Sequence, residues 1–205
     1  MSRGRFIVVE GIDGAGSSTQ ARRLAAELGA HLTAEPSAGP VGAFIRELLA
    51  GRAPRLDPGA MALLFAADRL DHVARELEPA LAAGRDVVSD RYDLSSLAYQ
   101  SATAPDPAAA VPWIRELNRP ARRPDLTIVV HVSAELAGRR RAARGGAAEL
   151  YEADELQRRL VEIYRDAERL VPGDRLAHVD GTPGADEVFA RVLAAARGLG
   201  PRVPR

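Results

Sequence analysis

The sequence predicts an α/β protein in which helices cover both faces of a parallel β-sheet. Short apolar segments alternate with helical segments along the 205 residues, and this alternation favours parallel strands joined by crossover helices. Glycine or polar residues follow the predicted strands. Because ligands bind at the carboxyl ends of strands in such sheets, these following residues are the first candidates for a functional site.

The predicted strands are short runs of apolar and β-branched residues. The first contains Phe-Ile-Val-Val, which is typical of a strand buried on both faces. The runs that carry this signal lie at residues 5–10, 31–35, 86–90, 126–132 and 175–180. The segments to examine for function are therefore residues 11–18, 35–37, 90–92 and 180–181.

Helical patterns fill the intervals between these strands. A proline-marked connection is expected at residues 104–112, and the Gly-Gly pair within residues 144–148 is typical of a hinge for a moving lid. The predicted helices cover about residues 18–29, 41–51, 58–83, 94–103, 108–118, 134–144, 152–171 and 185–198.

Length and composition predict one compact domain, residues 1–205, with a lid at about residues 139–152 and a frayed tail at residues 198–205. The formal net charge of +0 disfavours nucleic acid as a main partner. The absence of cysteine excludes a disulfide framework and fits a reducing cytoplasm. No apolar run approaches membrane-spanning length. We therefore expect a cytoplasmic protein that binds neither nucleic acid nor membranes.

A glycine-rich turn joins the first predicted strand to the first predicted helix. Gly11 and Gly16 match the glycines of the phosphate-binding motif G-x-x-x-x-G-K-[ST], and Ser18 matches its hydroxyl position. Ser17 stands where the motif has lysine, and all 28 basic residues of the chain are arginine. Backbone N–H groups at the start of a helix still bind phosphate without that lysine. Ser18 is then the candidate for binding Mg²⁺, and Thr19 adds a second hydroxyl.

Two other interpretations of this turn remain open. The glycines can serve only to make a tight strand-to-helix connection. Alternatively, Gly14-x-Gly16 begins a dinucleotide-binding pattern, and Glu35 lies about 20 residues further on, where a ribose-binding acid would stand. The third glycine position of that pattern holds Thr19, whose side chain would obstruct close packing of the helix.

A second polar segment follows the predicted strand at residues 86–90. Arg91 stands at the strand end, where its guanidinium suits bidentate capture of a phosphate, although an ion pair with Asp93 is the alternative. Ser96 and Tyr99 are three residues apart and face the same way on a helix.

An aromatic ring and a guanidinium also share one face of the predicted helix at residues 58–83. Phe65 and Arg69 are four residues apart, so the ring can stack on a base while the guanidinium binds its carbonyl edge. The alternative is a core phenylalanine covered by an arginine.

Together these segments resemble the thymidylate kinase family, which phosphorylates dTMP to dTDP. The resemblance runs from about Arg5 to Val188 in the order and spacing of the family. It implies a P-loop nucleoside monophosphate kinase fold with a five-stranded parallel sheet and a short lid, ATP with Mg²⁺, and usually a homodimer. The matching segments are Phe-Ile-Val-Val-Glu-Gly-Ile-Asp-Gly-Ala-Gly, Glu35-Pro36, Leu-Leu-Phe-Ala-Ala-Asp-Arg at 63–69, Asp-Arg-Tyr-x-x-Ser-x-x-Ala-Tyr-Gln at 90–100, Arg-Pro-Asp-Leu-Thr at 123–127, Leu-Tyr-Glu at 150–152 and Asp180-Gly181.

The resemblance implies that dTMP lies among residues of several segments. Phe65 would stack on thymine, Arg69 would bind its carbonyl edge, and Tyr99 would crowd the sugar 2′ position. Arg91, with help from Arg46, would hold the acceptor phosphate. The implied dTMP-binding residues are Asp13, Glu35, Pro36, Arg46, Phe65, Arg69, Arg91, Ser95, Ser96, Tyr99, Gln100 and Tyr151.

On the donor side, Arg144 resembles the lid arginine that stacks on adenine, and Asp180-Gly181 resembles the loop beside the base. The implied ATP-binding residues are Gly11, Gly14, Ala15, Gly16, Ser17, Ser18, Thr19, Arg144, Asp180 and Gly181. The implied catalytic residues are Asp13, Ser18, Arg91, Arg140 and Arg144, and the implied metal ligands are Ser18 and Asp90.

The chain departs from the family at three cation positions. Ser17 replaces the loop lysine, Gly14 replaces a loop arginine, and Leu150 replaces a lid arginine. One hypothesis is a dTMP kinase in which another arginine supplies the charge, with Arg139, Arg140, Arg141 and Arg144 as candidates, and Arg22 or Arg23 less plausible ones. The alternative is a catalytically impaired nucleotide-binding paralogue that still binds dTMP. A third hypothesis is a kinase that phosphorylates another nucleoside monophosphate.

Overall fold

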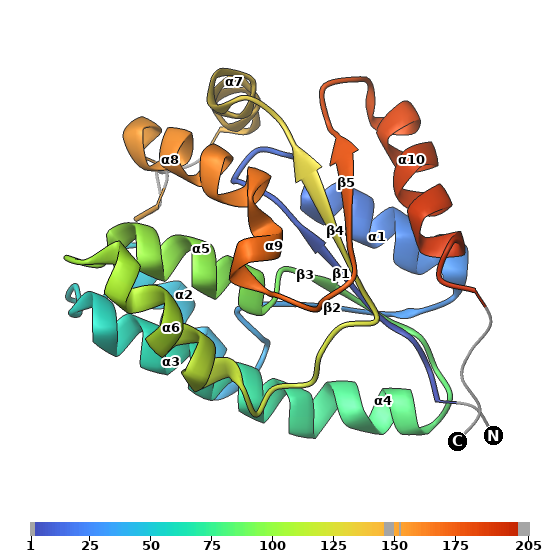
Figure 1. Cartoon of the computed structure of the whole chain (residues 1–205), viewed down its shortest axis with the longest axis horizontal. Helices are drawn as coiled ribbons and strands as arrows, with labels where there is room; N and C mark the ends of the chain where they lie inside the picture. The colour runs from blue at the N-terminus through green and yellow to red at the C-terminus, as the bar shows by residue number, and fades with distance from the viewer. Residues whose placement is uncertain (1–2, 146–149, 152, 201–205) are drawn as a thin grey trace.

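The computed structural model describes residues 3–145, 150–151 and 153–200, and its centre is a parallel sheet with the strand order β2-β3-β1-β4-β5 (Figure 1). Every strand lies within a range that the sequence predicts. The α/β class with a five-stranded parallel sheet is therefore confirmed. The strands are β1 (Phe6–Glu10), β2 (His31–Ala34), β3 (Val87–Asp90), β4 (Leu126–His131) and β5 (Leu176–Asp180).

Helices cover both faces of the sheet. α1 and α10 pack against each other on one face, whereas α8 covers β4 on the other face and packs against α5 (Figure 1). Across the ranges that the structure describes, no helix combines the length and apolar character needed to cross a bilayer. The helices are α1 (Ser17–Leu28), α2 (Pro40–Leu49), α3 (Pro58–His72), the π-helix η1 (Val73–Leu77), α4 (Glu78–Ala82), α5 (Asp93–Thr103), α6 (Pro107–Asn118), α7 (Ala134–Arg144), α8 (Asp154–Arg165), α9 (Ala167–Leu170) and α10 (Ala185–Arg197).

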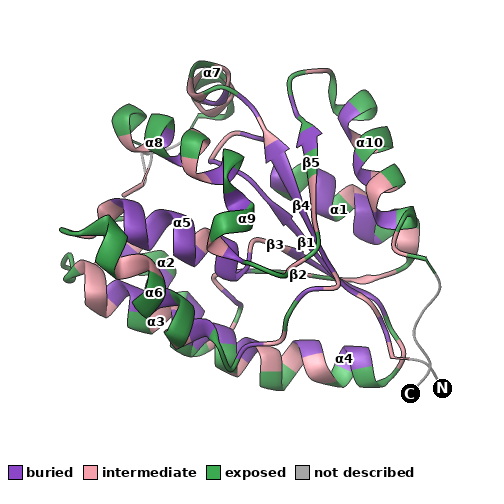
Figure 2. Ribbon diagram, in the orientation of Figure 1, coloured by how far each residue is buried: buried purple, intermediate pink, exposed green. Residues whose placement is uncertain are grey.

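The core lies around β1, which is buried along its whole length because it has strands on both sides and helices on both faces (Figure 2). The edge strand β2 alternates half-buried and exposed residues. In the register of the sheet, Val9 of β1 lies opposite Asp90 of β3. The segments that follow these two strands therefore leave the sheet side by side, although they are far apart in the sequence.

The helix predicted at residues 58–83 is divided into α3, η1 and α4. At its centre the N–H of Glu78 donates to the carbonyl oxygen of Val73, five residues back, which is the π-helical pattern. Pro79, which has no N–H to donate, follows directly. A continuous helical pattern in the sequence therefore corresponds to a helix with one wide turn.

Two other boundaries differ from those that the sequence predicts. The helix predicted at residues 152–171 is interrupted at Asp166, between α8 and α9. The connection predicted at residues 104–112 is shorter, because α6 already begins at Pro107. Asp106 caps this helix by accepting hydrogen bonds from the next two free N–H groups, and proline is well suited to the first helical position.

The predicted lid, hinge and tail are described only in part. Residues 139–144 belong to α7, and α10 ends at Arg197. Of the predicted lid at 139–152, hinge at 144–148 and tail at 198–205, residues 146–149, 152 and 201–205 lie outside the described residues.

Candidate active site

The glycine-rich turn after β1, residues 11–18, forms a loop closed by its own backbone and is called the phosphate loop below. Gly14 and Gly16 have φ values of 93° and 95°, a region that favours glycine. A Cβ atom at Gly14 would collide with the carbonyl oxygen of Ala137, so α7 lies directly on the loop. Within the ranges that the structure describes, no side chain caps the start of α1 at Gly16. Its first N–H groups are therefore available to an anionic ligand.

A carboxylate and a hydroxyl lie at the edge of this loop. Asp90, at the end of β3, and Ser18, in the first turn of α1, line the same cavity. The Oδ1 atom of Asp90 is buried and has no hydrogen-bond partner among the described residues. Since Mg²⁺ prefers oxygen ligands and keeps several waters, a carboxylate oxygen without a described partner, in a cavity that a hydroxyl also lines, fits such an ion.

Arg91 projects from the segment after β3 toward the phosphate loop. Its backbone is left-handed, with a φ of 71°, which is uncommon for a residue with a side chain. Its guanidinium lies 2.5 Å from Oδ1 of Asp13 and donates to Oγ of Ser95 at 2.9 Å and to the hydroxyl of Tyr99 at 3.3 Å. These three partners therefore hold the guanidinium of Arg91 between the phosphate loop and the segment after β3, where it can bind a phosphate.

Glu10, at the end of β1, holds this segment through four hydrogen bonds, although it is not among the site residues that the sequence predicts. Oε1 accepts from the backbone N–H groups of Tyr92 and Ser95, at 2.8 and 3.1 Å. Oε2 accepts from the hydroxyls of Ser95 and Tyr164, at 2.6 and 2.9 Å. Burial raises the pKa of Glu10 to about 7, although Arg91 opposes that change. The signal in the sequence was a single acid at the end of an apolar strand.

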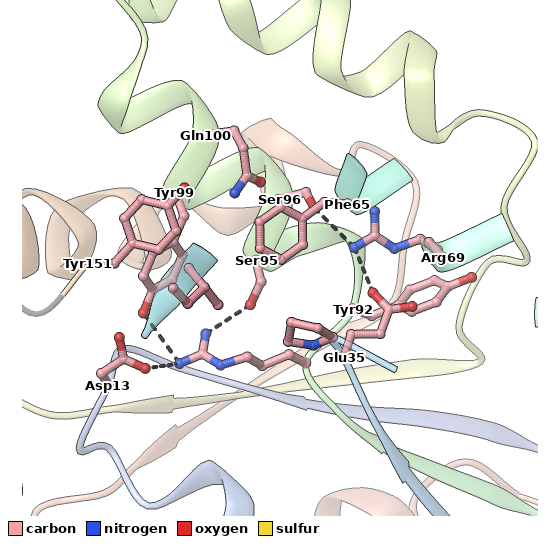
Figure 3. A pocket seen from close by; sticks show the side chains of 13 residues that line it. Asp13, Glu35, Phe65, Arg69, Tyr92, Ser95, Ser96, Tyr99, Gln100 and Tyr151 are labelled. Atoms are coloured by element: carbon pink, nitrogen blue, oxygen red, sulfur yellow. Dashed lines mark hydrogen bonds and ion pairs between the residues drawn. The ribbon is translucent and has the colours of Figure 1, made fainter. Parts of the chain in front are cut away.

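A second buried cation, Arg69, lines a cavity together with Arg91, and Figure 3 shows it pointing at Glu35. The Nη2 atom of Arg69 lies 2.7 Å from Oε2 of Glu35 and 3.0 Å from Oγ of Ser96. His72 contacts the other carboxylate oxygen at 3.1 Å. The side chains of Arg69 and Glu35 are only 1% and 3% exposed. Phe65 lies between this pair and Asp13 in the view of Figure 3.

The cavity between these two cations has a volume of about 130 Å³. It is lined by all of the predicted acceptor-side residues except Arg46, and also by Leu49 and Tyr92. Arg46 lies in the neighbouring cavity with Ser18 and Asp90, and its guanidinium donates to the carbonyl oxygens of Pro36 and Ser37 at 2.9 and 2.5 Å. The cavity thus offers an apolar and aromatic wall with a cation at each end, which suits a planar polar molecule that carries an anionic group.

A further cavity lies on the other side of the phosphate loop. Ala15, Gly16 and Thr19 line it together with Gly181 and Arg140. Arg140 donates to the carbonyl oxygens of Ala15 and Gly181, at 3.3 and 3.0 Å, and so connects the phosphate loop to the segment after β5.

The two remaining donor-side residues lie at element ends. The exposed carboxylate of Asp180 accepts from the N–H of Thr182 at 2.9 Å. Hydrogen bonds from Thr182, from its side chain first and then from its backbone, lower the pKa of Asp180. Arg144 is the last residue of α7. Of the predicted donor-side residues, the structure therefore brings Ala15, Gly16, Thr19 and Gly181 into one cavity.

Comparisons with known proteins identify relatives along nearly the whole chain. Residues 9–192 match the family model described as thymidylate kinase. The chain is 43% identical over 199 residues to a thymidylate kinase from Dinoroseobacter shibae, covering 93% of this chain and 95% of that protein. It is 40% identical over 190 residues to a probable thymidylate kinase from Pyrobaculum aerophilum, covering 91% and 93%. The solved structure of thymidylate kinase from Candida albicans matches it with a TM-score of 0.80 at 26% identity, covering 95% and 91%.

Proposed function

Since the chain belongs to the thymidylate kinase family, we infer that it transfers the γ-phosphate of ATP to dTMP, giving dTDP and ADP. The observation that carries this inference is the cavity lined by Phe65, Arg69 and Arg91 beside the phosphate loop. It combines an aromatic face and a polar edge for a base with a cation for the acceptor phosphate. The relatives are named as thymidylate kinases, so they do not support the alternative hypothesis of a catalytically impaired nucleotide-binding paralogue.

On the acceptor side, Phe65 stacks on thymine and Arg69 donates to its carbonyl edge with Ser96 beside it. Tyr99 restricts the space beside the sugar, which favours deoxyribose over ribose. Arg91 clamps the phosphate of dTMP, and Asp13 holds Arg91 in place through the 2.5 Å ion pair. This arrangement supports in-line transfer because catalysis of phosphoryl transfer is mostly positioning and charge neutralisation.

On the donor side, the N–H groups of residues 14–19 would hold the phosphates of ATP. Asp180 and Gly181 lie on the side of the base, where Arg140 anchors Gly181, and Arg144 would stack on adenine. Ser18 and Asp90 would hold Mg²⁺, which supplies charge neutralisation at the phosphate oxygens when it is bound. The Oδ1 atom of Asp90, which has no hydrogen-bond partner in the described part of the chain, supports this assignment.

We also propose that the enzyme is a homodimer. Phe44 of α2, Leu63 and Leu70 of α3, and Trp113 of α6 are large apolar side chains that remain exposed. These three helices contact one another through α3, so the four side chains lie on adjoining elements. We also place the enzyme in the cytoplasm, because a chain without cysteine fits a reducing compartment. Sedimentation velocity should give a dimer, and Leu63→Glu should give monomers, whereas Leu32→Glu on β2 should leave the dimer intact; a wild-type monomer contradicts the proposal.

The first experiment is the initial rate of ADP release from Mg-ATP with and without dTMP, together with dTMP binding by calorimetry. We expect dTMP-dependent release at about 1–100 s⁻¹, the ordinary range for kinases. As competing acceptors, dUMP should be used more readily than UMP because of Tyr99. Binding of dTMP without turnover would instead establish the impaired nucleotide-binding protein, and a preference for UMP would establish a different acceptor.

A further inference from the structure

The phosphate loop receives two arginines from α7, and they reach it at different places. Arg140 donates to the carbonyl oxygen of Ala15, whereas Nη1 of Arg141 donates to the carbonyl oxygen of Asp13 at 2.7 Å. Both contacts follow from the close approach of α7 to the loop, since Gly14 leaves no room for a side chain below Ala137. Helix α7 therefore brings cations to a loop that has no lysine of its own.

Arg140 and Arg141 differ in the other groups to which each is connected. Arg140 also binds Gly181 and lines the donor-side cavity. Arg141 instead shares Asp13 with Arg91, because the carboxylate of Asp13 pairs with Arg91 while its carbonyl oxygen accepts from Arg141. Asp13 also lines the acceptor-side cavity. Arg141 is thus bonded to the one residue of the phosphate loop that also lines the acceptor-side cavity, among the residues that the structure describes.

The charge of Arg141 is poorly balanced in the described part of the chain. Its side chain is 9% exposed, and its carboxylate partner there is Asp154, at 3.4 Å. The side chain of Asp154 is 75% exposed, so solvent weakens this contact. Burial of a cation without close compensation is unfavourable, and an anionic ligand would relieve it. The two bonds that Arg141 makes to described residues use only some of its guanidinium donors.

We propose that Arg141 is a catalytic residue that supplies the cation missing at Ser17 by binding the transferring γ-phosphoryl group. This inference rests on the proposed dTMP kinase function. In the step, an oxygen of the dTMP phosphate forms the new bond to the γ-phosphorus while the bond to the ADP oxygen breaks. The electron pair of the broken bond stays with ADP, and Arg141 stabilises the spread negative charge without giving up a proton.

The test compares Arg141→Ala and Arg141→Lys with Arg158→Ala. Arg158 is a matched control because it is an exposed arginine of α8 with a loose 3.9 Å pair to Glu135. We expect Arg141→Ala to lower kcat about 100-fold or more, the cost of removing one preorganised charge contact. Arg141→Lys should lose less, Arg158→Ala should retain activity, and dTMP binding by calorimetry should change little in all three.

Restoring the charge separates catalysis from a structural role. Ser17→Lys in the Arg141→Ala background should recover at least about tenfold in kcat, and free guanidinium should also raise the rate, since both return a cation to the site. Ser17→Lys in the wild type should bring a smaller gain. The inference is overturned if Arg141→Ala keeps wild-type kcat, or if its loss is rescued by neither the lysine nor guanidinium. Failure of the wild type to release ADP with dTMP overturns the proposed function as well, so the two failures are distinguishable.

Discussion

Asp13 and Arg91 form an ion pair of 2.5 Å that joins the phosphate loop after β1 to the segment after β3. The pair is possible because β1 and β3 are neighbours in the sheet, with Val9 opposite Asp90. Asp13 thus connects the loop proposed for the donor phosphates to the arginine proposed for the acceptor phosphate. The carbonyl oxygen of Asp13 also accepts a hydrogen bond from Arg141.

Removal of the guanidinium of Arg91 should weaken dTMP binding and slow phosphoryl transfer together. For Arg91→Ala we expect weaker dTMP binding in calorimetry and a loss of about 10²–10³ in kcat/KM, because the acceptor phosphate loses its positioned cation. Arg119→Ala is the control, since Arg119 is exposed and pairs only with Glu116 of its own turn among the described residues. Unchanged kinetics in Arg91→Ala would show that another residue holds the phosphate.

The metal assignment predicts a specific dependence on Mg²⁺. Chelation of the metal should stop ADP release, and Asp90→Asn should raise the Mg²⁺ concentration for half-maximal rate by about tenfold or more, as for loss of a metal-orienting group. The replacement keeps the shape of the side chain but removes the charge beside Ser18. Glu116→Gln, on the exposed face of α6, should leave the Mg²⁺ titration unchanged. An unaltered titration in Asp90→Asn would refute the metal role.

Glu10 predicts a pH dependence of stability. The pKa of Glu10 is raised from 4.5 to about 7 by burial, so between these values the folded state binds more protons than the unfolded state. The free energy of unfolding should therefore contain a contribution that falls as pH rises through this window, by about 3 kcal/mol in total. Below a pH of 4.5, the ordinary pKa of the group, this stabilising contribution is fully present.

The measurement is urea unfolding of the wild type and Glu10→Gln at several pH values between about 5 and 7. Glutamine cannot ionise, so the difference in the free energy of unfolding between the two proteins should change with pH in favour of the variant as pH rises. The contributions of all other ionisable groups to the free energy of unfolding are the same in both proteins and cancel in this difference. A difference that is independent of pH would mean that Glu10 ionises normally.

The buried pair of Arg69 and Glu35 predicts a large effect on stability as well as on binding. Arg69→Met removes the cation and leaves Glu35 buried with His72 as its remaining described partner. We expect a loss of about 3–5 kcal/mol in the free energy of unfolding, the usual cost of breaking a buried pair from one side. Calorimetry should also show weaker dTMP binding.

An exposed pair provides the control for this experiment. Arg165→Met removes the partner of Glu162 one turn away on α8, where both side chains are 64% exposed. That variant should unfold at nearly the wild-type urea concentration because exposed pairs contribute little. Equal stability losses in the two arginine variants would show that burial does not determine the effect of Arg69.

Local patterns in the sequence determined the class of fold and singled out most of the residues that line the candidate acceptor cavity. Apolar runs identified every strand, and the residues after the strands included Arg91 and Asp90. Periodicity placed Phe65 and Arg69 on one helical face. The interruption at η1 was not predictable, because the residues of that turn keep a helical pattern whether the backbone bonds span four residues or five.

Tertiary structure alone decided which charged groups meet. Three consecutive arginines on α7 look equivalent in the sequence, and only the docking of α7 on Gly14 directs Arg140 toward Gly181 and Arg141 toward Asp13. Glu10 likewise became significant through partners far away in the chain. The physical reason is that a side chain's direction along a helix or strand is a local property, whereas its partners depend on how separate elements pack.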